Sequence, residues 1–206
     1  MSLEIYLIRE GKDTSQKNLC KSKFSALNDS LVSCGIPTYQ YDPNRISDKT
    51  QFPYMRYRVS DLDYLKSLAA KLEENPKWVP DRNFVHKKIS PDLKKKFIDK
   101  NRSHLICHYN YIGYYVPVSF QNACLPSGFL STIGSSFNLR DELKNIANKL
   151  NLNLVTYTPN RELLFEQIYQ VVIEGDLLEF EKILLLELYN MALGSIKYNL
   201  IINFCG

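Results

Sequence analysis

Residues 103–120 read SHLICHYNYIGYYVPVSF, and residues 134–151 read GSSFNLRDELKNIANKLN. The first stretch is rich in β-branched and aromatic residues on both sides of turn-forming Asn and Gly residues, which predicts two adjacent strands at 104–109 and 111–120. The second stretch begins with Gly-Ser-Ser and then carries apolar residues at helical spacing, which predicts a helix at 136–150. This unit of strands followed by a helix indicates a protein that combines a sheet with helices.

The same reasoning extends to the rest of the chain. Further strands are expected at 3–9, 54–59 and 151–156 and within 196–206. Further helices are expected at 21–33, at 60–72, from Ser90 onward, at 161–173 and at 176–193. We therefore predict one α+β domain over 1–206. It has a central, mostly antiparallel sheet packed against several helices, and its C-terminal part is rich in helix.

The composition is that of a globular protein. The chain has 206 residues, of which 45% are hydrophobic and 23% charged, and this balance argues against disorder. The five cysteines are an odd number, widely spaced and without a CxxC pair, so we expect reduced, buried thiols rather than a disulfide framework. The N-terminal sequence has no basic region of a signal peptide, and we expect a cytoplasmic protein with no membrane contact.

Charge is distributed unevenly along the chain, although the net charge is only +4. Residues 82–102 contain eight Lys and Arg residues against two Asp. Residues 162–187 contain seven carboxylates against one Lys. Such segregation can steer a charged partner, and it also arises from ordinary solvated helix faces.

His104 and His108 are candidate functional residues because imidazole is the side chain best suited to proton transfer and metal binding near neutral pH. On the predicted strand they share a face, but their Cα atoms are roughly 13 Å apart, and no third ligand is apparent. Adjacent residues of a strand point to opposite faces, which also separates the side chains of Cys107 and His108. No catalytic motif is present. We expect no metal, no cofactor and no catalytic residue.

Ser135 and Ser136 precede the predicted helix at 136–150, where free backbone N–H groups attract anions. Either serine can instead cap the helix, which is the usual role of serine at this position. Together with His104 and His108, these serines outline a candidate pocket for a small ligand.

Tyr111, Tyr114 and Tyr115 lie on the second predicted strand, close to His108. Tyrosine offers a large and fairly rigid contact area with a polar tip, which is typical of interface hot spots. These residues, or else the acidic C-terminal helices, are therefore candidates for binding another protein.

A family resemblance points the same way. Gly113 to Pro117 reads GYYVP, and it is followed by the Gly-Ser-Ser turn and by a helix of the form LxxELxxIA beginning at Leu139. This outline, with His104 and His108 before it, resembles small bacterial immunity proteins that accompany polymorphic toxins. The resemblance covers about a quarter of the chain and implies a cytosolic protein that neutralises a toxin.

Three functions are therefore kept open. The first is a cytosolic protein-binding module, of which an immunity protein is one form. The second is a ligand-binding domain or enzyme with a pocket near His104, His108 and the helix start at 134–136. The third is nucleic-acid binding through the basic segment 82–102, which predicts steep salt dependence.

Overall fold

Five strands form one sheet in the computed structural model of this protein, which describes residues 2–9, 14–46, 51–80, 88–100, 103–125 and 132–206. The strands are β1 (Ser2–Ile8), β2 (Tyr54–Arg58), β3 (Ile112–Val116), β4 (Thr132–Ser135) and β5 (Ile201–Cys205). Their order is β2-β1-β5-β3-β4. Every neighbouring pair is antiparallel except β3 and β4, which are parallel. The predicted α+β fold with a mostly antiparallel sheet is confirmed.

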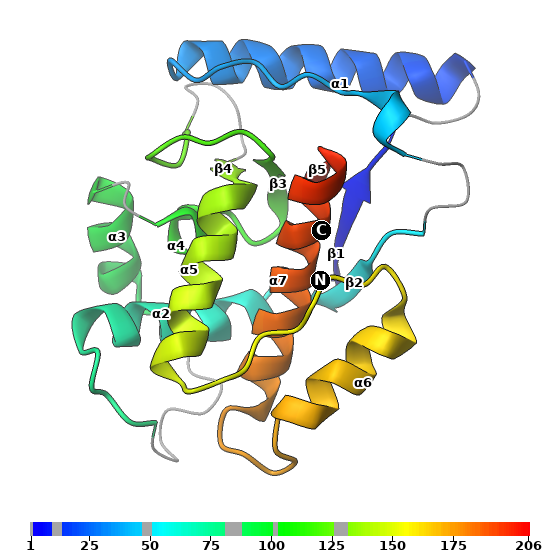
Figure 1. Cartoon of the computed structure of the whole chain (residues 1–206). Coiled ribbons are helices and arrows are strands. Elements are labelled where there is room, and N and C mark those ends of the chain that lie inside the picture. The colour runs from blue at the N-terminus through cyan, green and yellow to red at the C-terminus, as the bar shows by residue number, and fades with distance from the viewer. Residues whose placement is uncertain (1, 10–13, 47–50, 81–87, 101–102, 126–131) are drawn as a thin grey trace.

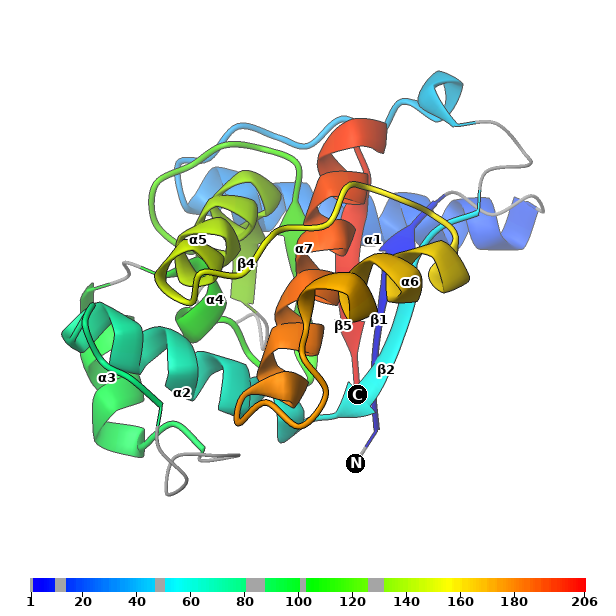
Figure 2. The ribbon, with the colours of Figure 1, turned by 60° about the horizontal axis from the view of Figure 1, so that its bottom comes forward.

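Helices cover both faces of this sheet. They are α1 (Thr14–Ser33), α2 (Asp61–Glu74), α3 (Pro91–Lys100), α4 (His104–Cys107), α5 (Ser136–Lys149), α6 (Arg161–Val171) and α7 (Glu179–Tyr198), with a short 3-10 turn, η1 (Pro43–Arg45). Figures 1 and 2 show α1 alone on one side of the sheet, and α2, α5, α6 and α7 on the other. Within the described residues, no helix has the length and apolarity needed to cross a lipid bilayer.

Alternation along β1 divides the core into two parts. Leu3, Ile5 and Leu7 belong to the large cluster beneath α2, α5 and α7. Tyr6 and Ile8 belong to the smaller cluster beneath α1. Because neighbouring side chains of a strand point to opposite faces, one short strand serves both layers.

Helix α7 is the central helix of the larger layer, as its apolar circumference predicts. Leu184, Leu185, Leu186 and Met191 are all completely buried. The helix begins at Glu179 rather than at 176, because residues 174–178 form a turn in which the Asp176 side chain accepts the N–H of Leu178 at 2.8 Å. It ends at Asn199, whose positive φ of 56° closes the helix before β5.

The strand predicted at 104–109 is wrong, because residues 104–107 form the short helix α4. The Ser103 side chain accepts the N–H of Ile106 at 3.0 Å, and the Glu142 carboxylate accepts the N–H groups of His104 at 2.6 Å and Leu105 at 3.0 Å. The first backbone N–H groups of a helix have no acceptor within the helix. Here the acceptor is the carboxylate of Glu142, almost forty positions away in the sequence. The expected common strand face of His104 and His108 therefore does not exist.

Two smaller expectations also fail. Residues 152–156, which we expected to form a strand, join α5 to α6 without pairing to the sheet. Residues 121–133, of which 126–131 lie outside the described residues, were expected to form a loop, whereas β4 begins at Thr132 and pairs with β3. A strand of four residues contains too few side chains for its alternation to be recognised.

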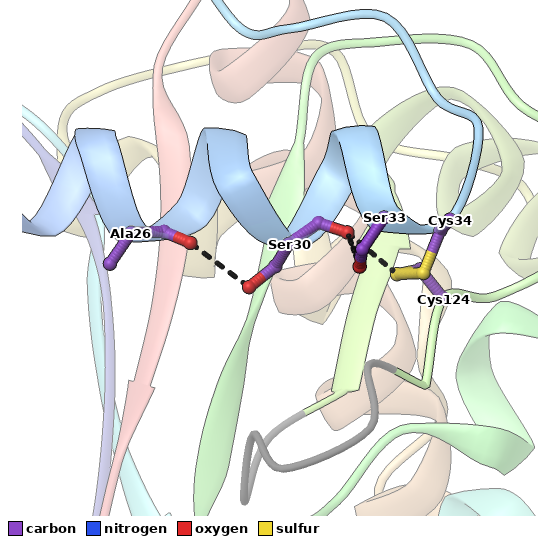
Figure 3. The surroundings of a disulfide bond; sticks show 5 residues. All are labelled: Ala26, Ser30, Ser33, Cys34 and Cys124. Atoms are coloured by element: carbon purple, nitrogen blue, oxygen red, sulfur yellow. Dashed lines mark hydrogen bonds between the residues drawn. A yellow bond between two sulfur atoms is a disulfide. The ribbon is translucent and has the colours of Figure 1, made fainter.

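The expectation that the cysteines are reduced is wrong for two of them. Cys34, just after α1, forms a disulfide with Cys124, and their Cα atoms are 6.0 Å apart. Figure 3 shows this bond beside the last turn of α1, with the Cys124 sulfur 3.7 Å from the Ser30 carbonyl oxygen. The backbone of Cys124 forms hydrogen bonds with the backbone of Ile133 in β4, so the disulfide links the end of α1 to the β4 side of the sheet. Only the fold brings together cysteines that are 90 positions apart.

Candidate functional site

The polar residues singled out in the sequence meet in the protein interior around α4. The backbone N–H of Ser135 donates to Nδ1 of His104 at 2.9 Å. This bond leaves Nε2 to carry the proton of the neutral ring, 3.2 Å from the Gln121 carbonyl oxygen. The Tyr115 hydroxyl donates to the His104 carbonyl at 2.9 Å. Burial lowers the pKa of His104 below its usual value, so the neutral ring is the stable form.

His108 lies in a second part of the same interior, stacked on Tyr115 with the ring centroids 4.3 Å apart. Its Nδ1 lies 2.6 Å from the Tyr109 carbonyl oxygen, while its Nε2 has no partner among the described residues. The buried amine of Lys66 donates to the His108 carbonyl oxygen. Burial, with the nearby Lys66 charge as a second cause, lowers the pKa of His108 to about 3.

The two serines at the start of α5 are structural. The Ser135 hydroxyl accepts the N–H of Asn138 at 3.4 Å, which makes it the N-cap. The hydroxyl of Ser136 lies 2.7 Å from that of Ser195 on α7. Both serines are completely buried. A ligand would therefore reach this helix start only if the packed elements above it moved.

The three candidate tyrosines do not share one surface. Tyr115 is buried in the larger core, and Tyr114 packs in the smaller cluster on the α1 side. Tyr111 alone is well exposed, with 48% of its surface accessible, and its ring lies 6.4 Å from that of Tyr109. The fold therefore divides these three tyrosines between two cores and the solvent.

The acidic C-terminal part is exposed mainly on α6 and the turn after it. The Asn160 side chain caps α6 by accepting the N–H of Leu163 at 3.1 Å, and the inner side of the helix buries Leu164 and Ile168. Glu162, Glu166 and Glu174 are exposed. We call the surface formed by residues 162–174 that point away from the core the outer face of α6.

The other carboxylates of this part serve different roles. Asp176 forms an ion pair with Lys182 at 2.9 Å, which lowers the pKa of Asp176. Glu181 and Glu187 are buried in α7. Burial raises the pKa of Glu187 to about 7, and its Oε2 has no partner among the described residues. Within the acidic C-terminal part, the exposed negative charge is therefore concentrated on the outer face of α6.

The basic and acidic parts lie on opposite sides of the molecule. Figures 1 and 2 both place α3 and α6 at opposite sides, with α5 and α7 between them. Lys95 and Lys96 on α3 are exposed. The basic segment also includes residues 82–87 and 101–102, which lie outside the described residues. The charged side chains of α3 and α6 thus do not neutralise each other by direct contact.

A pocket of about 460 Å³ lies between α2, α3, α4 and α5. Its apolar lining includes Leu93, Phe97 and Ile146. Two ion pairs lie at its rim, Lys96 with Glu74 at 3.9 Å and Lys149 with Glu73 at 3.5 Å. The size suits a small ligand, but both lysines of the lining are paired with carboxylates, and the third carboxylate, Glu142, is bonded to the start of α4. Among the described residues, no three His, Cys, Asp or Glu side chains come close enough together to hold a metal ion.

Comparison with protein families identifies the group to which the chain belongs. Residues 1–204 match the family model described as "Putative DNA-mimic protein". This chain belongs to that DNA-mimic family. Searches of curated proteins and of solved structures found no match. The family match extends over nearly the whole chain, so the sheet, the buried polar cluster and α6 are all parts of one family domain.

The sequence analysis missed two features of this DNA-mimic family member. Lys66 follows Leu62 by four positions and lies in the apolar stripe of α2, which is a signal that it is buried. Burial lowers the pKa of Lys66 to about 7. Helix α6 carries more apolar residues than one buried face can hold, which is a signal that some of them are exposed.

Proposed function

We propose that this protein is a protein-binding module whose partner is a DNA-binding protein. In this proposal the carboxylates on the outer face of α6 occupy the partner's phosphate-binding positions. The observation that carries the proposal is the gathering of exposed carboxylates on α6, across the molecule from the lysines of α3. Membership of the DNA-mimic family supports the same reading.

The resemblance to DNA is local in this proposal. Duplex DNA carries about one negative charge per 1.7 Å of helix axis, whereas this chain has a net charge of +4. A partner attracted by net charge alone would not be held. Glu162 and Glu166 are one helical turn apart, so their Cβ atoms are about 6 Å apart, and carboxylates can pair with Lys and Arg as phosphates do.

A competition assay tests the proposal. The heparin-binding proteins of the source cells are mixed with a short fluorescent DNA duplex, and the protein is then added while the anisotropy of the duplex is recorded. Release of the duplex at micromolar protein is expected, because protein and DNA compete for one basic surface. If the duplex stays bound at all protein concentrations, the proposal is overturned.

Charge-matched variants identify the side that binds. The triple variant Glu162→Gln, Glu166→Gln, Glu174→Gln should release the duplex only at about tenfold higher concentration or more. The control is Asp29→Asn, Asp92→Asn, Asp99→Asn, which makes the same charge change at exposed positions on α1 and α3. Equal loss in both variants would indicate that net charge matters and the outer face of α6 does not.

A measurement with only the duplex and this protein, without any partner, tests whether the basic segment binds nucleic acid. If its anisotropy rises on addition of this protein without any partner, and the rise disappears at high salt, the chain itself binds nucleic acid. An unchanged anisotropy is expected, because the lysines of α3 are few and are interspersed with Asp92 and Asp99.

A narrower form of the proposal makes the partner a toxin. It rests on the resemblance of residues 113–117 and of the helix after them to immunity proteins. Co-expression tests this form: growth stopped by a toxin from a neighbouring gene should be restored by this protein. It should not be restored by the Glu162, Glu166 and Glu174 variant. Growth that stays arrested with the unaltered protein would reject the toxin as partner.

A further inference from the structure

The outer face of α6 exposes apolar side chains as well as carboxylates. Leu163 is 49% exposed, Tyr169 65% and Ile173 74%. Leu177 in the following turn is 40% exposed. Single exposed apolar residues are normal on protein surfaces, but neighbouring ones indicate a place where another molecule binds.

These residues are not needed for packing within the chain. The contact of α6 with the core is centred on Leu164, Ile168 and the residue after the helix, Val172, which are at most 5% exposed. Phe165 and Val171 pack beside them and are partly buried. A helix normally carries one apolar stripe toward its core and polar residues elsewhere. Helix α6 has a second apolar group on the side away from the core.

The aromatic part of this second group is held in place by its neighbours. The ring of Tyr169 stacks with Phe165 at 5.9 Å between centroids. The Arg161 guanidinium lies over the same Phe165 ring at 5.4 Å. A side chain that is already ordered loses less conformational entropy on binding, which makes Tyr169 suited to be an interface anchor.

The charges around the apolar group indicate which kind of molecule can bind there. Glu162 and Glu166 lie on the same exposed side of α6, and Glu174 follows Ile173 directly. A second copy meeting this face would bring carboxylates against carboxylates, which is unfavourable. A DNA duplex would be repelled for the same reason. A basic protein surface would match it, with its Lys and Arg on the carboxylates and their aliphatic stems or an apolar residue on Tyr169 and Ile173.

We infer that the outer face of α6 is the docking surface for a basic protein partner, with Tyr169 and Ile173 as the anchors that provide affinity. Glu162, Glu166 and Glu174 orient the partner around these anchors. The inference rests on the proposed function and adds to it, because the phosphates of DNA provide no equivalent of the apolar contacts made by Tyr169 and Ile173. Affinity should therefore persist in part at salt concentrations that abolish DNA binding.

The test uses the same competition assay at low salt and at the highest salt concentration at which the duplex still binds its partner. The variant Tyr169→Ser, Ile173→Ser should need at least about tenfold more protein to release the duplex. The loss should be as large at high salt as at low salt. The matched control is Tyr109→Ser, Val79→Ser, which removes one exposed aromatic and one exposed aliphatic side chain elsewhere. The control should stay within about twofold of the unaltered protein.

The outcomes separate this inference from the proposed function. If the unaltered protein releases the duplex and the Tyr169, Ile173 variant does so equally well, the anchors are rejected and the proposed function remains. If the unaltered protein releases nothing, both are rejected. Sedimentation gives the remaining outcome: a dimer of the unaltered protein that is lost in the variant would assign this face to a second copy and overturn the basic partner.

Discussion

The cluster around His104 and the outer face of α6 use side chains in opposite ways. Around His104, imidazole, hydroxyl and carboxylate groups are buried and bonded to the backbone of distant elements. On α6, a tyrosine and an isoleucine are exposed without a covering element. The residue types known for chemistry stabilise the fold in this protein, and ordinary residues form the surface that is free to bind.

The physical reason for the difference is the cost of burial without partners. A buried polar group destabilises the fold unless it is hydrogen-bonded, so the cluster has to be specific in geometry. An exposed apolar group costs little in the free protein and contributes free energy only when it is covered. Substitutions in the first region should therefore change stability, and those in the second should change binding.

The largest effect is expected for His104→Ala. The variant leaves the N–H of Ser135 without its acceptor and opens a cavity beside Phe120, which together cost about 4 kcal/mol. Urea unfolding followed by circular dichroism measures the change. A loss below about 1 kcal/mol would indicate that the cluster is not a structural unit and would make a functional role for His104 more attractive.

The disulfide gives the next largest effect. Replacement of both Cys34 and Cys124 by Ser should lower the free energy of unfolding by about 3 kcal/mol, because a long loop in the unfolded chain is then no longer closed. The protein's ability to release DNA from its partner should not change, since α1 lies across the sheet from α6. Unfolding with and without a reductant provides an independent measurement, and an equal midpoint would contradict the cross-link.

A smaller effect, dependent on pH, is expected for Glu187→Gln. Burial raises the pKa of Glu187 from 4.5 to about 7, so between these values the folded protein keeps a proton that the unfolded chain releases. Stability therefore falls as the pH rises through this range, and at pH 8 the variant should be more stable by about 2–3 kcal/mol. At pH 4 the two proteins should be equal.

The exposed Glu166→Gln is the control for this measurement, and its stability should follow the unaltered protein at every pH. A Glu187→Gln variant with an unchanged pH profile would mean that the buried carboxylate has a partner that stabilises its charge.

The smallest effect on stability is expected on α6 itself. The Tyr169→Ser, Ile173→Ser variant should unfold within about 0.5 kcal/mol of the unaltered protein, because neither side chain packs in the core. Thermal and urea unfolding measure this directly. A large loss would show that these residues belong to the fold, and the contrast between the two regions would disappear.

Local patterns were sufficient for most of the fold. Helices α2, α5 and α6 lie where their apolar spacing predicts them, and Ser135 caps α5 as a serine before a helix is expected to do. The amphipathic pattern is local, since it depends on residues three or four positions apart. The pattern can therefore be recognised in a single sequence, without knowing which elements the helix packs against.

The candidate site was predicted less well, because exposure depends on the whole fold. The sequence grouped His104 with Ser135 in one pocket, and the structure places the His104 ring against the N–H of Ser135. The sequence did not indicate that they would be covered. The excess of apolar residues in α6 indicates that some of them are exposed, but the packing of α7 against one side of the helix decides that Tyr169 and Ile173 are among them.

The sequence by itself determined the class of fold, most helices, and the separation of a basic from an acidic part, because these follow from composition and from short-range periodicity. Tertiary structure alone decided three further features. It turned residues 104–107 into a helix through the carboxylate of Glu142, it paired Cys34 with Cys124, and it left one side of α6 uncovered. Each of these depends on residues that are distant in sequence and become neighbours only when the chain has folded.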